Sequence, residues 1–179
     1  MKRLLVLVAC AATVAACGGR TAGAAGTAAS IARAQATGEY PSPRPPAESA
    51  AGGAPGAAEA IRRFATAYIN WTADTVAADM QMLAADSVGQ ARSMLVLAAT
   101  QTAGDYELHQ GGIANSGAVE AIAPLGAAGD QYVVVTREST TATNTNAYQG
   151  LRPAWHVALA TVRRRADGGW VLSGWQPES

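Results

Sequence analysis

The chain has 179 residues, of which 15% are charged and 6% aromatic, and its formal net charge is zero. This length allows one ordinary domain with residues to spare. A neutral chain lacks the strongly basic face of a nucleic-acid-binding protein, so we expect no nucleic-acid partner. The only cysteines are Cys10 and Cys17, and the only histidines are His109 and His156. These counts exclude a disulfide framework and a three-histidine metal site, and we expect no metal and no cofactor.

The N-terminus has the layout of a secretory signal peptide, for which we assign residues 1–16. Lys2 and Arg3 precede an uncharged, largely apolar run of 13 residues from Leu4 to Ala16. A membrane-spanning helix needs about 20 residues to cross the hydrocarbon core, so this run is too short to span it. Three kinds of segment remain possible: a lipoprotein signal peptide, an ordinary signal peptide and an uncleaved N-terminal anchor.

The signal ends in Val14-Ala15-Ala16-Cys17. This sequence resembles the lipobox of bacterial lipoproteins, in which an aliphatic and two small residues precede the lipidated cysteine. The resemblance implies cleavage before Cys17 and a diacylglyceryl group on its sulfur, and two acyl chains anchor a protein stably where one is marginal. Cleavage at Cys10, which ends a similar pattern, would leave too short an apolar run. We therefore expect an extracytoplasmic, membrane-anchored lipoprotein on the cell surface or the periplasmic face.

Residues 17–57 are expected to form a flexible linker. They consist mainly of Ala, Gly, Thr, Ser and Pro, and Ile31 and Tyr40 are the exceptions among larger apolar residues. Such a segment cannot bury enough surface to offset the entropy cost of ordering. A flexible chain of this length would span roughly 35 Å from end to end. It would hold a folded domain, residues 58–177, away from the membrane.

Helical periodicity opens this domain. Apolar residues recur at the spacing of one helical face from residue 58 onward, at Ile61, Phe64, Ala65 and Tyr68. A second helix is expected from about 75 to 85. A third is expected from about 88 to 101, after the capping signal Asp86-Ser87.

From Asp105 the apolar period changes to two, which predicts strands. We expect strands at 106–114 with a bulge at Gly111-Gly112, and at 118–124, 131–138, 154–165 and 170–176. A turn at 115–117, loops at 126–130 and 139–150, and a hairpin turn at 167–169 would join them. Helices followed by an antiparallel meander predict an α+β fold, in which two or three helices cover a curved sheet of four to five strands.

Two stretches carry a resemblance to a known superfamily. Phe64-Ala-Thr-Ala-Tyr-Ile-Asn-Trp71 and Gly168-Gly-Trp-Val-Leu-Ser-Gly-Trp175 resemble the opening helix and closing strand of the cone-shaped fold shared by nuclear transport factor, ketosteroid isomerase and polyketide-cyclase-like proteins. Within that superfamily, an extracytoplasmic domain on an N-terminal anchor resembles the assembly-factor domain of type IV secretion and conjugation machinery. Those proteins use a transmembrane helix as the anchor, whereas the anchor expected here is a lipid.

The resemblance implies that any chemistry takes place inside the cone. Enzymes of this superfamily use an Asp, a His or a Tyr there, because a carboxylate in an apolar pocket can shuttle protons while a tyrosine donates to an oxyanion. The candidates in this chain are Tyr68, Tyr106, Tyr132, Glu138 and His156. None of them lies in a recognised catalytic motif.

Strand alternation places several further side chains. If Trp155, Val157 and Leu159 face the helices, His156 lies on the outer face of the sheet. Glu107 and His109 would share one strand face, where a solvated pair is the prediction and an acid–base pair the alternative. The four tryptophans are expected in the core, and any exposed one would instead indicate a binding face. Arg163-Arg164-Arg165 is interpreted as a solvated hairpin end, with contact to an anionic partner as the alternative.

Two functions follow as hypotheses. The first is a lipid-anchored, non-enzymatic interaction module whose partners are the membrane, through Cys17, and proteins of a cell-envelope assembly of the secretion or conjugation type. The second is a small-ligand-binding protein or an isomerase- or dehydratase-like enzyme that uses the cone interior. A cone filled by Trp and Met side chains favours the first. An open pocket lined by His156, Glu138 or a tyrosine favours the second. The oligomeric state stays open.

Overall fold

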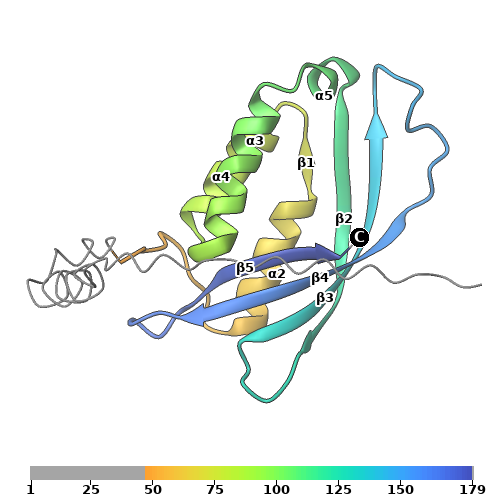
Figure 1. Ribbon diagram of the computed structural model, residues 1–179. Helices are drawn as coiled ribbons and strands as arrows, with labels where there is room; N and C mark the ends of the chain where they lie inside the picture. The colour runs from red at the N-terminus through yellow and green to blue at the C-terminus, as the bar shows by residue number, and fades with distance from the viewer. Residues whose placement is uncertain (1–46, 179) are drawn as a thin grey trace, which may run out of the picture. The chain divides into compact units, whose positions relative to one another are not determined.

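The computed structural model describes residues 47–178, where helices pack on a curled antiparallel sheet (Figure 1). This arrangement confirms the expected α+β class. The helices are α2 (Ala57–Ile69), α3 (Val76–Ala85), α4 (Gly89–Ala103) and α5 (Tyr106–Gly111). The strands are β1 (Trp71–Thr72), β2 (Ile113–Pro124), β3 (Gln131–Ala142), β4 (Ala154–Arg164) and β5 (Trp170–Glu178).

The strands follow one another in the sheet in the order β1-β2-β3-β4-β5, and each neighbouring pair is antiparallel. The pairing of β2 with β3 shifts register between Val119 and Ala121, and that of β4 with β5 shifts between Thr161 and Val162. Such bulges bend a strand and increase its twist. The sheet therefore curls around the helices as a half-barrel, which gives the cone-like form seen in Figure 1.

The core lies between the helices and the concave face of the sheet. Ile61 and Leu95 from the helices and Val134 from β3 have no exposed surface. Burying a side chain of this size stabilises the fold by about 1.5–3 kcal/mol. Phe64 lies 5.2 Å from Trp175, ring centroid to ring centroid, and fills the same space. We call this region the packed end of the concave face.

The predicted strand at 106–114 is wrong over its first six residues, because residues 106–111 form α5. The Asp105 side chain accepts a hydrogen bond from the Leu108 backbone N–H at 3.0 Å, as an N-cap does. Gly112 ends the helix in the left-handed conformation, with φ +58°. Glu107 and His109 are therefore not neighbours on a strand. His109 Nε2 lies 3.2 Å from the Thr102 carbonyl oxygen instead.

The predicted turn at 115–117 is also wrong, since these residues lie inside β2. A Cβ atom on Gly117 would lie 2.5 Å from the carbonyl oxygen of Arg137, so glycine here permits a close approach of two strands. The Asn70 side chain holds the same glycine through its backbone N–H (3.0 Å) and carbonyl (3.2 Å). Pairing of β2 with β3 extends to Ile113 and Ala142. The first residues of the predicted 139–150 loop are therefore strand.

A segment of small residues before α2, residues 47–56, packs on the domain. Ala50 and Ala54 are buried, and Ala54 exchanges two backbone hydrogen bonds with Trp170 at 2.9 and 2.8 Å. Arg165 donates to the Gly52 carbonyl and forms a salt bridge with Asp167 at 3.1 Å. The compact unit that the structure describes thus includes residues 47–57, which the sequence analysis assigned to the linker. The predicted signal peptide, Cys17 and the rest of the predicted linker lie outside the described residues.

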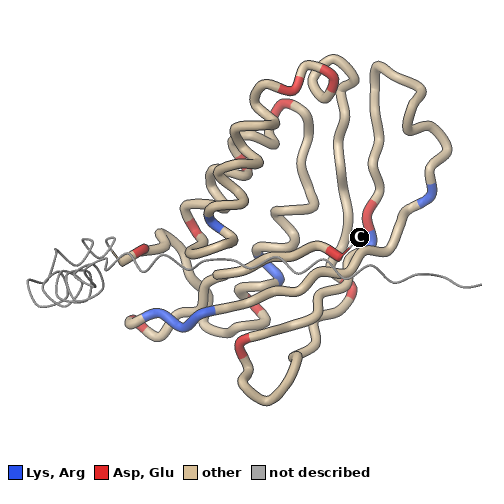
Figure 2. The backbone as a smooth tube through the Cα atoms, viewed as in Figure 1, with Lys and Arg blue, Asp and Glu red and all other residues tan. Residues whose placement is uncertain are grey.

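The β4–β5 hairpin carries the arginine run, which Figure 2 shows as a continuous basic stretch. Arg163 and Arg164 are exposed, as predicted for a solvated hairpin end, whereas Arg165 is half-buried against residues 47–56. The predicted turn is confirmed by the bond from the Arg165 N–H to the Gly169 carbonyl at 2.7 Å. No helix in the part of the chain that the structure describes is both long and apolar enough to span a membrane.

Candidate functional site

A cavity of about 590 Å³ opens at the other end of the concave face, which we call the open end. Its volume falls within the range of small-molecule binding pockets, about 300–1,000 Å³. Apolar side chains from β1, α3, α4 and the loop before β4 form its walls: Trp71, Val76, Met80, Ala98 and Leu151. Ala154 at the start of β4 also lines the cavity, together with polar side chains from α2, α4, strands β2 to β4 and the loop before β4: Tyr68, Thr102, Asn115, Glu138, Thr140, Arg152 and His156.

Glu138 is the centre of a hydrogen-bonded network on the sheet side of this pocket. Its Oε1 atom accepts from the Thr136 hydroxyl at 2.6 Å, and its Oε2 atom accepts from Asn115 Nδ2 at 2.8 Å. The second N–H of the Asn115 amide donates to the Ile69 carbonyl at 2.8 Å. The Asn115 Oδ1 atom accepts from the Thr140 hydroxyl at 3.1 Å. These bonds hold both side chains in one orientation.

The strand register explains why these groups meet. Asn115 pairs with Thr140, and Gly117 pairs with Glu138, so all four residues lie on the concave face. Gly117 leaves room for the carboxylate, because a Cβ atom there would lie 3.1 Å from Glu138 Cγ. The glycine that permits close strand packing therefore also permits the acidic side chain to turn into the pocket.

Tyr68 joins the packed end to the pocket. Its ring lies 5.8 Å from Phe64 and 5.5 Å from Trp175, centroid to centroid. Burial raises the pKa of Tyr68 above its ordinary value of 10.0, the nearby Glu138 carboxylate adds to the rise, and the indole N–H of Trp175 opposes it. The buried Trp175 Nε1 atom forms no hydrogen bond within residues 47–178, so this last contact is looser than a hydrogen bond. At neutral pH the phenol is protonated and available as a donor.

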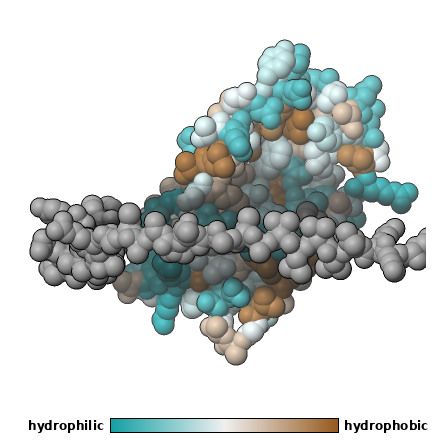
Figure 3. All heavy atoms as spheres, in the orientation of Figure 1, coloured by the Kyte–Doolittle hydropathy of each residue, from teal (hydrophilic) through white to brown (hydrophobic). Residues whose placement is uncertain are grey.

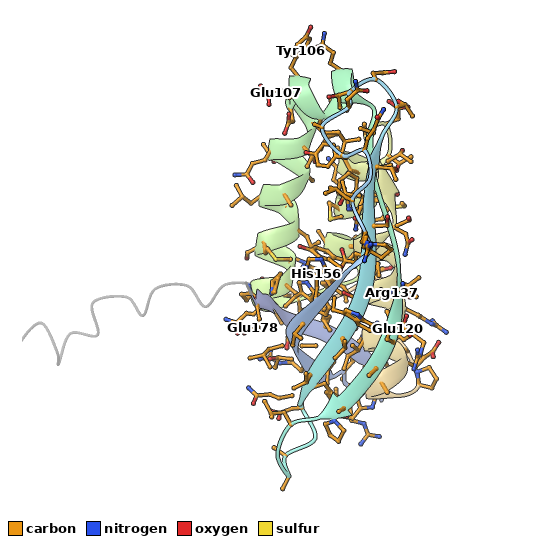
Figure 4. The ribbon with its side chains drawn as sticks, turned by 90° about the vertical axis from the view of Figure 1, so that its right-hand side faces the viewer. Tyr106, Glu107, Glu120, Arg137, His156 and Glu178 are labelled. Carbon is orange, nitrogen blue, oxygen red and sulfur yellow. The ribbon has the colours of Figure 1, made fainter. Side chains whose placement is uncertain are left out.

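The structure reverses the predicted face of His156. In β4, Ala158, Ala160 and Val162 are buried against the core, and His156 lies on the same face by alternation. It is exposed at the mouth of the pocket (Figure 4). The prediction assumed that the bulkiest residues of β4 face the helices. Small alanines face them instead, because Trp175 of the neighbouring strand, paired with Ala160, fills the space.

Trp155 consequently lies on the convex face, which contradicts the prediction that all four tryptophans are core residues. Its side chain is 63% exposed. It pairs with Arg137 across β3 and β4, and the guanidinium carbon lies 5.9 Å from the indole centroid. That is a cation–π distance. Of the other tryptophans, Trp175 is fully in the core, while Trp71 and Trp170 pack against it half-buried.

Two of the candidate tyrosines lie elsewhere. The Tyr132 ring packs against the core, and its hydroxyl donates to the Gly129 carbonyl at 3.2 Å in the β2–β3 loop. Tyr106 is 70% exposed on α5. The structure thus brings together Tyr68, Glu138 and His156, and leaves Tyr106 and Tyr132 outside the pocket.

Sequence reasoning missed Asn115, whose side chain makes three of the four hydrogen bonds of this network, whereas Glu138 makes two. The sequence Asn115-Ser116-Gly117 has the composition of a turn and was interpreted as one. The signal that could have identified it is the alternation continuing through Ile113, Asn115 and Gly117 into Val119, which share one face of β2. A polar residue within a face that is otherwise apolar or glycine indicates either a partner or a site.

The chemistry available in the pocket is that of hydrogen bonding and proton transfer. Glu138 supplies acceptor atoms, Tyr68 a neutral phenol, and His156 an imidazole at the mouth. No cluster of three or more His, Cys, Asp or Glu side chains able to hold a metal ion occurs among residues 47–178.

No protein-family model matches the sequence. A search of curated proteins likewise finds no match.

Proposed function

We propose that this chain is a lipid-anchored extracytoplasmic protein whose cone-like domain binds a small, partly apolar molecule in the pocket at the open end. The single observation that carries this proposal is the solvent-accessible cavity of about 590 Å³ with Tyr68, Glu138 and His156 in its lining. A cone interior filled by Trp and Met side chains would instead favour an interaction module without a ligand. Apolar walls supply affinity in a site of this kind, while a few fixed polar groups supply orientation.

The proposal is tested by a thermal-unfolding screen of the full chain against small molecules of neutral, cationic and anionic classes. A ligand that binds only the folded state raises the unfolding temperature by mass action. Ala98→Phe would fill the pocket, since Ala98 is half-buried on the pocket side of α4. Ala78→Phe is the matched control, because Ala78 is exposed on α3 and does not line the pocket.

The expected result is a set of compounds that stabilise the wild type and Ala78→Phe but not Ala98→Phe. A screen in which no compound stabilises the wild type, or in which Ala98→Phe responds equally, would contradict the proposal.

The lipid anchor on Cys17 is a second part of the proposal and has its own test. Cells expressing the chain are fed radiolabelled palmitate, and the label on the protein is measured. We expect incorporation that Cys17→Ala abolishes and Cys10→Ala leaves intact. Labelling that survives Cys17→Ala would refute the assignment. The two cysteines make matched variants within one segment.

A second candidate function, an interaction module of a secretion- or conjugation-type envelope assembly, is favoured by the exposed Trp155 on the convex face. Exposed aromatic side chains are enriched at protein interfaces. Apolar residues also lie at the surface of the α3–α4 pair (Figure 3), where Met82, Val96 and Leu97 are more than half exposed. In-cell cross-linking of the full chain would test this function. Loss of a specific envelope partner in Trp155→Ser, but not in Ala98→Phe, would support it, and equal capture by both variants would contradict it.

A further inference from the structure

We propose that the ligand of this pocket is an organic cation, a protonated amine on an apolar body, with its ammonium group bound at Glu138. This inference rests on the proposed function, because it names the chemical class of molecule for the same cavity. Four observations carry it: the hydrogen-bonding capacity left on the network, the charge balance of the pocket, the aromatic lining, and the position of the acid beside apolar walls.

The network around Glu138 uses up its donors and leaves acceptors free. The two side-chain N–H groups of Asn115 donate hydrogen bonds, one to the Ile69 carbonyl and one to Glu138. The Thr136 hydroxyl donates to Glu138, and the Thr140 hydroxyl donates to the Asn115 side-chain oxygen. A carboxylate offers about four acceptor positions. Each Glu138 oxygen receives one of these bonds, so about two positions remain. A ligand that satisfies this group must donate hydrogen bonds.

The Glu138 carboxylate also forms no salt bridge with any residue that the structure describes. Within residues 47–178 the salt bridges are Arg63–Glu59 and Arg165–Asp167, and neither involves Glu138. Arg137, next in sequence, lies on the opposite face against Trp155. Removing a carboxylate from water without a partner is costly, and a charged donor offsets that cost far better than a neutral one. The ligand class with both properties is a protonated amine.

The remaining lining suits the rest of such a molecule. Tyr68 and Trp71 line the pocket together with Glu138. Aromatic faces attract organic cations through the ring quadrupole. Val76, Met80 and Ala98 provide aliphatic surface across the cavity on α3 and α4. An amine with an apolar body can therefore place its charge at the sheet and its body against the helices.

One cationic side chain among the described residues, Arg152, also lines the cavity, and it lies exposed in the loop before β4. His156 stands at the mouth as well. A ligand directed by these two groups would be an anion. The test therefore includes an anionic probe, so that binding directed by Glu138 is compared with binding directed by Arg152 and His156.

Three probes of one shape separate the alternatives: 2-phenylethylamine, 2-phenylethanol and phenylacetate. Each is titrated into the full chain by isothermal calorimetry at neutral pH. We expect the amine to bind at least tenfold more tightly than the alcohol, since charge-assisted hydrogen bonds are about twice as strong as neutral ones. Phenylacetate should bind most weakly of the three.

Glu138→Gln keeps the side-chain size and removes the charge. We expect this variant to lose about tenfold in affinity for the amine and to retain its affinity for the alcohol, which also reports that the pocket is intact. Glu120→Gln is the matched control, because Glu120 is an exposed acid at the bulge of the neighbouring strand (Figure 4). It should bind all three probes as the wild type does. The wild-type ranking of the probes needs no variant, so the proposal remains testable if Glu138→Gln does not fold.

The amine ranking first, with a loss confined to Glu138→Gln, would support the proposal. Equal binding of amine and alcohol, tighter binding of phenylacetate, or an unchanged amine affinity in Glu138→Gln would overturn it while leaving the pocket as a binding site. If none of the three probes binds, the cation proposal is also overturned. A neutral or anionic hit from the thermal-unfolding screen would then preserve the proposed function, and a screen without hits would overturn both.

Discussion

The two ends of the concave face are built from the same strands, yet one end is buried under covering side chains and the other is open to solvent. On β3, Val134 is fully buried at the packed end, and Glu138, four residues further along the same face, enters the cavity. On β4, Ala160 is buried while His156 is exposed. The two ends differ because the Trp175 and Phe64 side chains cover the sheet at the packed end. No side chain among the described residues fills the cavity at the open end. Position along a strand, and not residue type alone, separates core from site.

The largest expected loss in the free energy of unfolding comes from a substitution at the packed end. Trp175→Ala removes the indole that contacts both Phe64 and Tyr68, and deletion of a buried aromatic side chain of this size costs about 3–5 kcal/mol. Trp155→Ala should change the free energy of unfolding by less than about 1 kcal/mol, because that indole is mostly exposed. Chemical denaturation of both variants measures the difference. Equal losses would show that the convex face is as tightly packed as the core.

Gly117→Ala should give the next largest effect, because it forces the open end apart. The added Cβ meets the Arg137 carbonyl at 2.5 Å and Glu138 Cγ at 3.1 Å, and overpacking of this kind costs about 1–3 kcal/mol. Gly104→Ala is the control, since nothing lies within 4 Å of its Cβ position. We expect the first variant alone to lower the denaturation midpoint. If Gly104→Ala is as damaging as Gly117→Ala, the close approach of β2 and β3 is not the reason for glycine.

A smaller effect is expected at the cap of α5, which lies beside the open end. Asp105→Ala removes the acceptor for the Leu108 N–H and should cost about 1 kcal/mol. Asp105→Asn retains a capping side chain and should cost much less. Thermal unfolding distinguishes the two. A loss of equal size in both variants would indicate that the charge, and not the cap, matters.

The smallest expected effect is a decrease in stability at alkaline pH that is caused by ionisation of Tyr68. Its pKa is raised in the folded state by burial and by Glu138. Since the folded pKa exceeds the unfolded value, the stabilising contribution is complete below pH of about 10 and is lost as pH rises through the folded pKa. We expect the denaturation midpoint to fall above that pH in the wild type and to fall less in Tyr68→Phe. Parallel profiles would exclude Tyr68 as the titrating group.

The sequence predicted the fold well where periodicity was long. The first three helices and the last three strands lie close to their predicted bounds, because amphipathic or alternating patterns of seven or more residues dominate there. The β2–β3 and β4–β5 loops between these strands were predicted correctly with them. The α5 helix was missed because it has six residues and depends on one cap contact at Asp105, which no period reveals. The packing of residues 47–56 was missed because Ala and Gly carry no apolar signal, yet their small size lets the backbone reach Trp170.

The site was predicted in part. Tyr68 and Glu138 were among the candidates because their residue types suit a cone interior, and the structure places both in the pocket. The face of His156 was assigned wrongly, because both faces of β4 carry apolar residues and alternation alone does not say which is inside. Asn115 could not be found from composition, because Asn115-Ser116-Gly117 has the composition of a turn. The alternation from Ile113 to Val119 is the sequence signal for a strand, and the register with Thr140 shows that Asn115 lies within it.

The most direct test of the pocket uses the four tryptophan indole N–H signals in a nitrogen-15 NMR spectrum of the full chain, assigned by single Trp→Phe variants. Trp71 lines the cavity, whereas Trp155 lies on the convex face and Trp170 at the far end of β5. Titration with 2-phenylethylamine and 2-phenylethanol should shift the Trp71 signal saturably and leave those of Trp155 and Trp170 unchanged. A shift at Trp155 with none at Trp71 would contradict the account and place binding on the convex face.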